Sequence, residues 1–362
     1  MAKGFAQQDI HAGNVVDKKI LKPAYGLQEA AEQYLIQYSS ISGLDSKTLR
    51  QDTAAVFIPK GNVPKNGWPV VIWAHGTIGV GKNCAPSLNA RTARDSQYLN
   101  TWLSLGFAVV APDYAGLGSE GLHHYMNAKA AAYSVLDSAR AALRDFPLQN
   151  AFVFVGQSQG AHAAFASAGY QKTYAPELNI LATILTGTPY FNVMTSTQTV
   201  FGQPPRDGAD PKIPYAFYIY LAAADLDTTL KAETFFQKNA LPVLRQARNL
   251  CISQLSELTK NQKLNMANSL NPAIKNLLNL QIDSMQYPTL YIEHPVFIGI
   301  GNNDVNVPTA MQKKFSADVR KTGTLVEIHE YPGLDHSGTV NPSLRDSLPF
   351  IMRVMSASKI SH

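Results

Sequence analysis

The chain has 362 residues, of which 45% are hydrophobic and 16% charged, so it can bury a large core in one large domain or two modest ones. Its formal net charge of +5 is scattered, with no run of five like charges and no cluster of basic residues interleaved with aromatic rings. This pattern argues against a nucleic-acid site. No apolar stretch is long enough to span a bilayer as a helix.

The N-terminal residues and the cysteines bear on the compartment. Residues 1–14 contain no apolar core of the kind found in a signal peptide, so the chain is either a cytoplasmic protein or a mature form whose leader has been removed. The two cysteines, Cys84 and Cys251, form no C-x-x-C motif and show no metal-like Cys/His spacing. Their spacing leaves one disulfide and two free thiols equally open, and we predict no metal site.

Extended and apolar segments follow in chain order. Residues 28–41 and 47–58 are predicted to form a short helix and extended segments, with 53–58 as the clearest strand. Further on, short apolar runs bounded by Gly and Pro are typical of strands that are buried on both faces of a parallel sheet. These six runs lie at 69–74, 106–111, 151–155, 180–185, 295–300 and 325–331.

Helical patterns lie between the apolar runs. Residues 127–145 are rich in Ala and place Leu136, Ala139, Ala142 and Leu143 on one face of a helix. The alternation predicts an α/β fold with a mostly parallel central sheet flanked by helices, and active groups at the carboxyl ends of the strands. Residues from about 190 to 290 break this alternation, because they contain no strand-like run and favour helices over 232–258 and 262–285.

The segment Gly156-Gln157-Ser158-Gln159-Gly160 matches G-x-S-x-G and lies between the apolar run 151–155 and a helical run of small residues, 161–166. A serine at the tip of a sharp strand–turn–helix needs neighbours without side chains, because the strand and the helix otherwise collide. We therefore predict that Ser158 is a catalytic nucleophile.

Serine catalysis requires a base and a group that orients the base. In α/β hydrolases the acid and then the histidine follow the serine along the chain. Asp304 follows the run 295–300 and His336 follows the run 325–331, so we predict that His336 is the base and Asp304 its orienting acid. The other candidates fit less well, being too early in the chain, on a predicted helix, or in or beside strands: Asp283, Asp318, His294 and His329.

Backbone amides are predicted to bind the developing oxyanion. His75-Gly76-Thr77 follows the first parallel strand, and we place the two donors at the N–H groups of Thr77 and Gln159. Each donor of this kind contributes about 3–4 kcal/mol to transition-state stabilisation. His75 is predicted to be a structural hydrogen-bonding residue. His123 and His124 have no accompanying carboxylate motif, so they do not predict a metal site.

The ordered motifs resemble the secretory lipase family of α/β hydrolases, whose bacterial members include lipase-like esterases. The set in this order is typical of the hydrolases, and the segment at 112–118 narrows the resemblance to this branch; together the motifs span about 68–340. One departure is Ala161-His162 after the serine turn, which puts the packing of that helix in question. The matching segments are HGT at 75–77, CAPS at 84–87, PDYAGLG at 112–118, GQSQG at 156–160, DVNVP at 304–308 and DH at 335–336.

The resemblance implies a serine carboxylester hydrolase that works without a cofactor and is secreted or periplasmic. It implies an α/β-hydrolase core formed by 1–189 and 291–362, with 190–290 inserted as a helical cap over an acyl pocket. Fungal members carry a cysteine near the oxyanion loop that is bridged to one in the cap, so the resemblance predicts a disulfide between Cys84 and Cys251.

Other uses of the same residues remain open at this stage. The triad also suits amide or peptide hydrolysis and acyl transfer, and a hydrolase fold that has lost catalysis serves as a binding protein. We expect a small-molecule or lipid ester as partner, no nucleic acid, and at most peripheral contact with a lipid interface. A group of aromatic residues is predicted to belong to the core of the cap rather than to an acyl pocket: Tyr190, Phe191, Phe217, Tyr218 and Tyr220.

Overall fold

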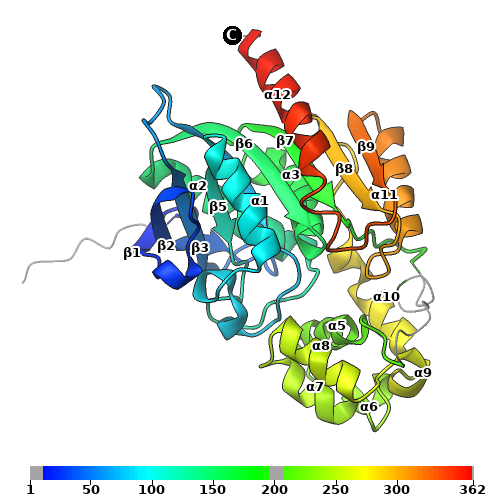
Figure 1. The fold of residues 1–362 in the computed structure, drawn as a ribbon. Helices are drawn as coiled ribbons and strands as arrows, with labels where there is room; N and C mark the ends of the chain where they lie inside the picture. The colour runs from blue at the N-terminus through cyan, green and yellow to red at the C-terminus, as the bar shows by residue number, and fades with distance from the viewer. Residues whose placement is uncertain (1–10, 196–199, 201–207, 361–362) are drawn as a thin grey trace, which may run out of the picture.

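A nine-stranded sheet runs through the computed structural model, which describes residues 11–195, 200 and 208–360 (Figure 1). Parts of two predicted segments, 1–10 at the N-terminus and 196–199 and 201–207 in the insertion, lie outside the described residues. The strand order is β1-β2-β3-β5-β4-β6-β7-β8-β9. The strands are β1 (Val15–Ile20), β2 (Ala30–Ile41), β3 (Leu49–Pro59), β4 (Trp68–Ala74), β5 (Ala108–Pro112), β6 (Leu148–Gln157), β7 (Ile180–Thr186), β8 (Val296–Gly301) and β9 (Val326–Tyr331).

The six predicted parallel strands are confirmed as β4 to β9. All of them pair in parallel with their neighbours, whereas β1, β2 and β3 add an antiparallel edge that joins the sheet through β3 and β5. Strand β4 shows why such runs are apolar throughout: Val70 and Ile72 belong to one core cluster, and Val71 and Trp73 to another. The sheet is therefore covered on both faces.

Helices supply that cover. One core cluster contains side chains of α2, α3 and α11, and the other contains side chains of α1 and α12, so the two sets pack on opposite faces of the sheet. Among the described residues, no helix is both long and apolar enough to cross a membrane. These helices are α1 (Ala93–Ser104), α2 (Ala128–Asp145), α3 (Gln159–Tyr174), α11 (Thr309–Lys321) and α12 (Leu344–Ile360).

The prediction of a short helix within 28–41 is wrong, because the segment forms the long strand β2. Its backbone pairs with β3 from Ala30 to Ile41, which satisfies its hydrogen bonds as a strand. Ile36 and Tyr38 point into the core with the two-residue period of a strand, and the Tyr38 hydroxyl donates to the Ser134 carbonyl 2.8 Å away on α2. Pairing with strands distant in the chain outweighs local helix propensity here.

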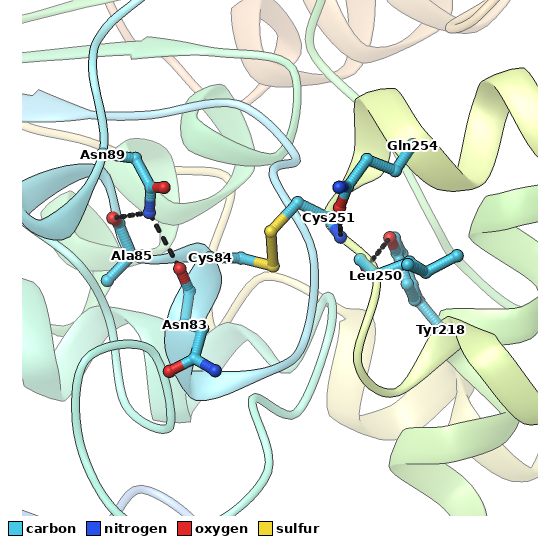
Figure 2. The surroundings of a disulfide bond; sticks show 8 residues. All are labelled: Asn83, Cys84, Ala85, Asn89, Tyr218, Leu250, Cys251 and Gln254. Atoms are coloured by element: carbon cyan, nitrogen blue, oxygen red, sulfur yellow. Dashed lines mark hydrogen bonds between the residues drawn. A yellow bond between two sulfur atoms is a disulfide. The ribbon is translucent and has the colours of Figure 1, made fainter.

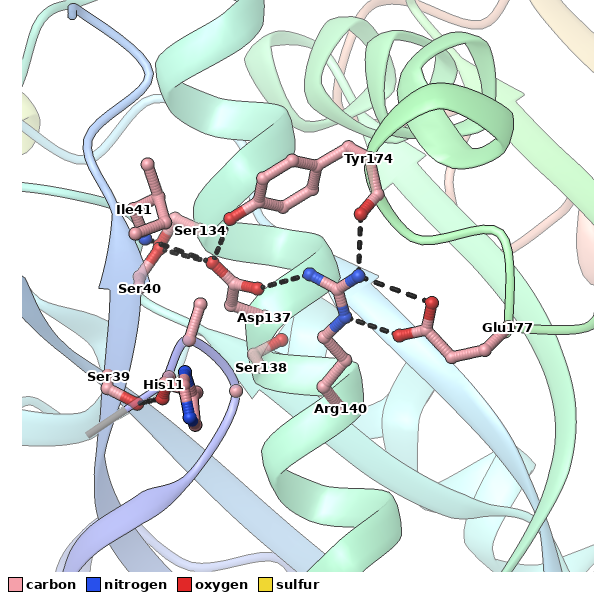
Figure 3. Close-up of polar contacts among 12 residues, drawn as sticks. His11, Ser39, Ser40, Ile41, Ser134, Asp137, Ser138, Arg140, Tyr174 and Glu177 are labelled. Carbon is pink, nitrogen blue, oxygen red and sulfur yellow. Dashed lines mark hydrogen bonds and ion pairs between the residues drawn. The ribbon is translucent and has the colours of Figure 1, made fainter. Parts of the chain in front are cut away.

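A buried polar network fixes α2 against β2 and the end of α3 (Figure 3). The Asp137 carboxylate accepts hydrogen bonds from the Ser40 hydroxyl at 2.9 Å, the Tyr174 hydroxyl at 2.6 Å and the Arg140 guanidinium at 2.9 Å. Arg140 also donates to Glu177 at 2.5 Å. A buried charge is tolerated when it is paired and fully hydrogen-bonded, as Asp137 is here.

A helical lobe, defined here by α5 to α10, is inserted between β7 and β8 and lies beside one end of the sheet (Figure 1). It has its own apolar cluster, distinct from those on the two faces of the sheet. The predicted helices over 232–258 and 262–285 are each interrupted. Pro242 in the first turn of α7 and the capping residues Cys251 and Asn265 mark new helix starts. The helices are α5 (Ile213–Leu226), α6 (Ala232–Phe235), α7 (Leu241–Ala247), α8 (Ile252–Asn261), α9 (Met266–Ser269) and α10 (Ile274–Met285).

The predicted disulfide between Cys84 and Cys251 is confirmed (Figure 2). It joins the loop after β4 to the N-cap of α8 in the helical lobe. Next to it, the backbone N–H of Ile252 donates to the carbonyl of Ile78 at 2.8 Å. One covalent and one hydrogen bond therefore tie the lobe to the loop that contains Thr77.

We expect the double variant Cys84→Ser/Cys251→Ser to lose about 2–5 kcal/mol of unfolding free energy, because the bond closes a loop between residues 167 positions apart. Urea denaturation of both proteins measures the difference. The wild type after reduction and alkylation is the control and should lose a similar amount. An unchanged midpoint in both samples would contradict a stabilising role for the bond.

Candidate active site

Ser158 occupies the sharp turn between β6 and α3, with φ 59° and ψ −123°. This is a backbone conformation that non-glycine residues rarely adopt, and it projects the side chain away from the strand and helix axes. A Cβ on Gly160 would lie 1.8 Å from the Ala74 carbonyl oxygen, and one on Gly156 would lie 2.1 Å from the Gly160 carbonyl oxygen. Both glycines are thus required because the backbones of β4, β6 and α3 nearly touch.

Asp304 and His336 meet at the carboxyl ends of β8 and β9. The Nδ1 atom of His336 lies 2.7 Å from Oδ2 of Asp304, and both side chains are buried. The other carboxylate oxygen accepts from the backbone N–H groups of Asn306 at 3.0 Å and Val307 at 2.9 Å. The loop therefore holds the Asp304 carboxylate in one orientation.

Gln312 is a further partner of Asp304 that the sequence analysis missed. Its side-chain amide on α11 donates to Oδ2 of Asp304 at 2.9 Å and to the Val307 carbonyl at 2.8 Å. Oδ2 thus accepts from both Gln312 and His336. A glutamine on a helix carries no motif, so only the packing of α11 against the loop after β8 brings it to the site.

Ser158 and His336 line the same cavity, which has a volume of about 430 Å³. Thr77 lines it as well, from the loop after β4, and Tyr215 reaches it from the helical lobe. Gln159 is the first residue of α3, so its N–H has no carbonyl one turn earlier in the helix to bond. The structure thus brings together the residues predicted for the triad and the oxyanion site.

A second, narrower cavity of about 50 Å³ also reaches Ser158. Of the five aromatic candidates, Phe191 lines this cavity, whereas Phe217, Tyr218 and Tyr220 pack in the core of the helical lobe. Tyr190 packs in the core of the sheet instead. The described lining residues are Tyr125, Met126, Ser158, Pro189, Phe191, Val200, Lys212, Tyr215, Ile219, Asn306, Val307, Pro308 and Met311.

The Pro112–Gly118 segment supports the loop that carries Thr77. The Tyr114 hydroxyl donates to the His75 carbonyl at 2.8 Å, and the two rings stack with centroids 4.2 Å apart. The Asp113 carboxylate accepts from the Ser87 backbone N–H at 2.9 Å and from the Thr53 hydroxyl at 2.7 Å. Burial raises the pKa of Asp113 to about 6, although these hydrogen bonds oppose the shift. These contacts give His75, Asp113 and Tyr114 supporting positions around the loop.

His123 positions the side chain of Gln159. Its Nδ1 lies 2.9 Å from the Ala115 carbonyl, so this nitrogen is the donor and Nε2 accepts from the Gln159 amide at 2.6 Å. Burial lowers the pKa of His123 to about 3, which keeps the ring neutral. Among the residues that the structure describes, no group of His, Cys, Asp or Glu side chains is suited to hold a metal ion.

The motifs and the geometry agree with a comparison against protein families. The model of the secretory lipase family matches residues 84–338. The chain belongs to the secretory lipase family. This match includes the nucleophile turn, the loops of Asp304 and His336, and both cysteines of the disulfide.

Individual relatives are more distant. The chain is 27% identical to lipase A of Moesziomyces aphidis over 191 residues, an alignment that covers 49% of this chain but only 39% of that relative. Its structure is similar to the closed state of Candida antarctica lipase A, with a TM-score of 0.76, 20% identity, and coverage of 96% of this chain and 83% of that one. It is also similar to the rice cell wall degrading esterase LipA of Xanthomonas oryzae, with a TM-score of 0.74, 17% identity, and coverage of 96% and 99%. These likenesses confirm the predicted α/β-hydrolase fold.

We expect Gly187→Ala to slow the labelling of Ser158 by a fluorophosphonate probe by about tenfold or more, since small misplacements of reacting groups cost this much. A Cβ at this position would lie 2.8 Å from Cε1 and 2.9 Å from Nδ1 of His336. Gly323→Ala is the matched control, because Gly323 also has a positive φ but no heavy atom within 4 Å of the added carbon. Equal labelling rates in the two variants would show that His336 tolerates the displacement.

His162 should make stability depend on pH. Its ring is buried, Nε2 lies 2.7 Å from the Met285 carbonyl at the end of α10, and burial lowers its pKa to about 4. The packing question raised by this residue is answered by that hydrogen bond and by the contact of its ring with Tyr287. A pKa below the unfolded value of about 6.5 means that its stabilisation is complete above pH 6.5 and is lost as pH falls toward 4.

Between pH 7 and pH 5 we expect the wild type to lose about 2 kcal/mol more unfolding free energy than His162→Gln, which retains a donor but does not titrate. Denaturant titrations at the two pH values measure this difference. His11→Gln, at an exposed position, is the control and should follow the wild type. Parallel pH profiles for the wild type and His162→Gln would be the contrary result.

Proposed function

We propose that this protein is a serine carboxylester hydrolase that cleaves acyl esters through an acyl-enzyme intermediate. The observation that carries the proposal is the cavity shared by Ser158 and His336, with His336 bonded to a buried Asp304 behind it. Membership of the secretory lipase family supports an ester as the substrate. The aligned region covers less than half of the curated relative, so the activity rests on the residues of this chain.

The proposed roles follow from the hydrogen-bond pattern. Because Nδ1 of His336 donates to Asp304, Nε2 is the basic nitrogen that remains to accept the proton of Ser158. The serine oxygen then attacks the acyl carbon, and the protonated imidazole returns its proton to the departing alcohol. Water attacks the acyl-enzyme by the same route, which regenerates Ser158 and releases the acid.

Thr77 and Gln159 are the proposed donors to the oxyanion. The Gln159 N–H lies at the start of α3, where the helix dipole also favours negative charge. The Thr77 side chain lies 2.8 Å from the Tyr125 hydroxyl, and this contact helps to hold the loop in place. With these donors the mechanism uses protein groups and water throughout.

The two cavities suggest where the two halves of the ester bind. The leaving alcohol must lie near His336, which protonates it, and His336 lines the 430 Å³ cavity. His336 is absent from the described lining of the narrow cavity, so we assign that cavity to the acyl group. Its volume of about 50 Å³ holds about four water-sized groups, which favours short acyl chains.

The helical lobe completes this assignment. Tyr215 and Ile219 of α5 line the narrow cavity, so we propose that 190–290 acts as a cap on a hydrolase core formed by 1–189 and 291–362. We also propose that the protein is secreted or periplasmic, which suits the family and a disulfide that closes a long loop.

We expect Ser158→Ala to reduce the hydrolysis of p-nitrophenyl esters by about 10⁴-fold or more, because loss of a triad member leaves only binding and the oxyanion donors. A series from acetate to palmitate should show the highest kcat/KM for short acyl chains. Ser167→Ala, one helix face away on α3 and bonded to the Ala163 carbonyl, is the control and should retain activity. Full activity in Ser158→Ala would refute the nucleophile, and an optimum at palmitate would refute the acyl assignment.

A further inference from the structure

Lys212 is a buried cation at the start of α5. Its side chain is 2% exposed, and its Nζ atom has no hydrogen-bond partner among the described residues. The nearest carboxylate oxygen is Oδ2 of Asp210, at 3.9 Å, and that oxygen is also without a hydrogen-bond partner. The two atoms therefore attract each other without being bonded to each other.

This arrangement is unfavourable for a purely structural ion pair. An ammonium group taken out of water costs several kcal/mol unless hydrogen bonds replace its lost water contacts. Accordingly, burial lowers the pKa of Lys212 and raises the pKa of Asp210. Asp210 is held in place by its other oxygen, which accepts the Lys212 backbone N–H at 2.9 Å.

Lys212 lines the narrow cavity that reaches Ser158. It is the only charged residue among the described residues that line this cavity, and most of the others are apolar or aromatic. A chain bound there thus passes along an apolar wall and meets one ammonium group. A plain alkyl chain would leave both Lys212 and Asp210 without a partner.

We infer that the narrow cavity selects acyl groups that carry a hydroxyl, which accepts a hydrogen bond from Nζ of Lys212 and donates one to Oδ2 of Asp210. A hydroxyl is the smallest group that both accepts and donates, as this pair of atoms requires. A carboxylate would place a second negative charge beside Asp210 in a buried site. The inference rests on the proposed ester hydrolysis and names its substrate class.

The test uses pairs of p-nitrophenyl esters in which a hydroxyl replaces a methyl of nearly equal size. The pairs are 2-hydroxypropionate with 2-methylpropionate, 3-hydroxybutyrate with 3-methylbutyrate, and 5-hydroxyhexanoate with 5-methylhexanoate. In the wild type we expect kcat/KM to favour the hydroxylated member of at least one pair by about tenfold or more, because a site built to bond a hydroxyl rejects analogues without it.

Lys212→Met should reverse that preference, because its side chain is apolar and of similar length. If the single variant does not fold, Asp210→Asn/Lys212→Met removes both charges together and should show the same reversal. Lys231→Met, at an exposed position of the lobe, is the matched control and should keep the wild-type preference.

Two results would overturn the inference while ester hydrolysis stands. One is a wild type that prefers the methyl member of every pair or shows no preference. The other is a preference for the p-nitrophenyl monoester of succinate over the hydroxylated esters, which would assign the site to carboxylates. Calorimetric binding of the methyl esters of the same acids to Ser158→Ala tests the preference without turnover, so a failure of the proposed hydrolysis is recognised separately.

Discussion

The close approach of three backbone segments at the serine turn is the constraint on which the site depends. β4, β6 and α3 pass so near one another that Gly156 and Gly160 admit no side chain, and Ser158 is held at a positive φ. This strain is maintained because a fully buried parallel sheet surrounds it. The serine is consequently presented at the carboxyl edge of the sheet, where the loops after β8 and β9 bring the acid and the histidine.

The same edge is organised by buried histidines that stay neutral. His75, His123 and His162 are each buried, and burial lowers the pKa of each ring well below its ordinary value. Each has a ring nitrogen near a backbone carbonyl, so each connects segments that are distant in the chain. These histidines orient the oxyanion loop, the Gln159 side chain and the junction of α3 with the lobe, while His336 alone is paired with a carboxylate in the cavity.

The helical lobe does more than cover the site. The disulfide and the hydrogen bond from Ile252 to Ile78 connect it to the oxyanion loop, and Lys212 and Tyr215 of its first helical segment line the narrow cavity. The lobe therefore contributes both to the geometry of the proposed oxyanion site and to the polarity of the proposed acyl cavity. Its core is separate from those of the sheet, so its position depends on these few connections.

The sequence by itself determined the parallel strands, the serine turn and the order of acid and histidine, because buried strands and tight turns leave short local patterns. It did not reveal that 28–41 is a strand, since pairing with β1 and β3 decides that. Gln312, Gly187 and Lys212 carry no motif, and they matter only because folding places α11, the end of β7 and the start of α5 around the cavity. Contacts between residues far apart in the chain are set by packing, and only the tertiary structure decides them.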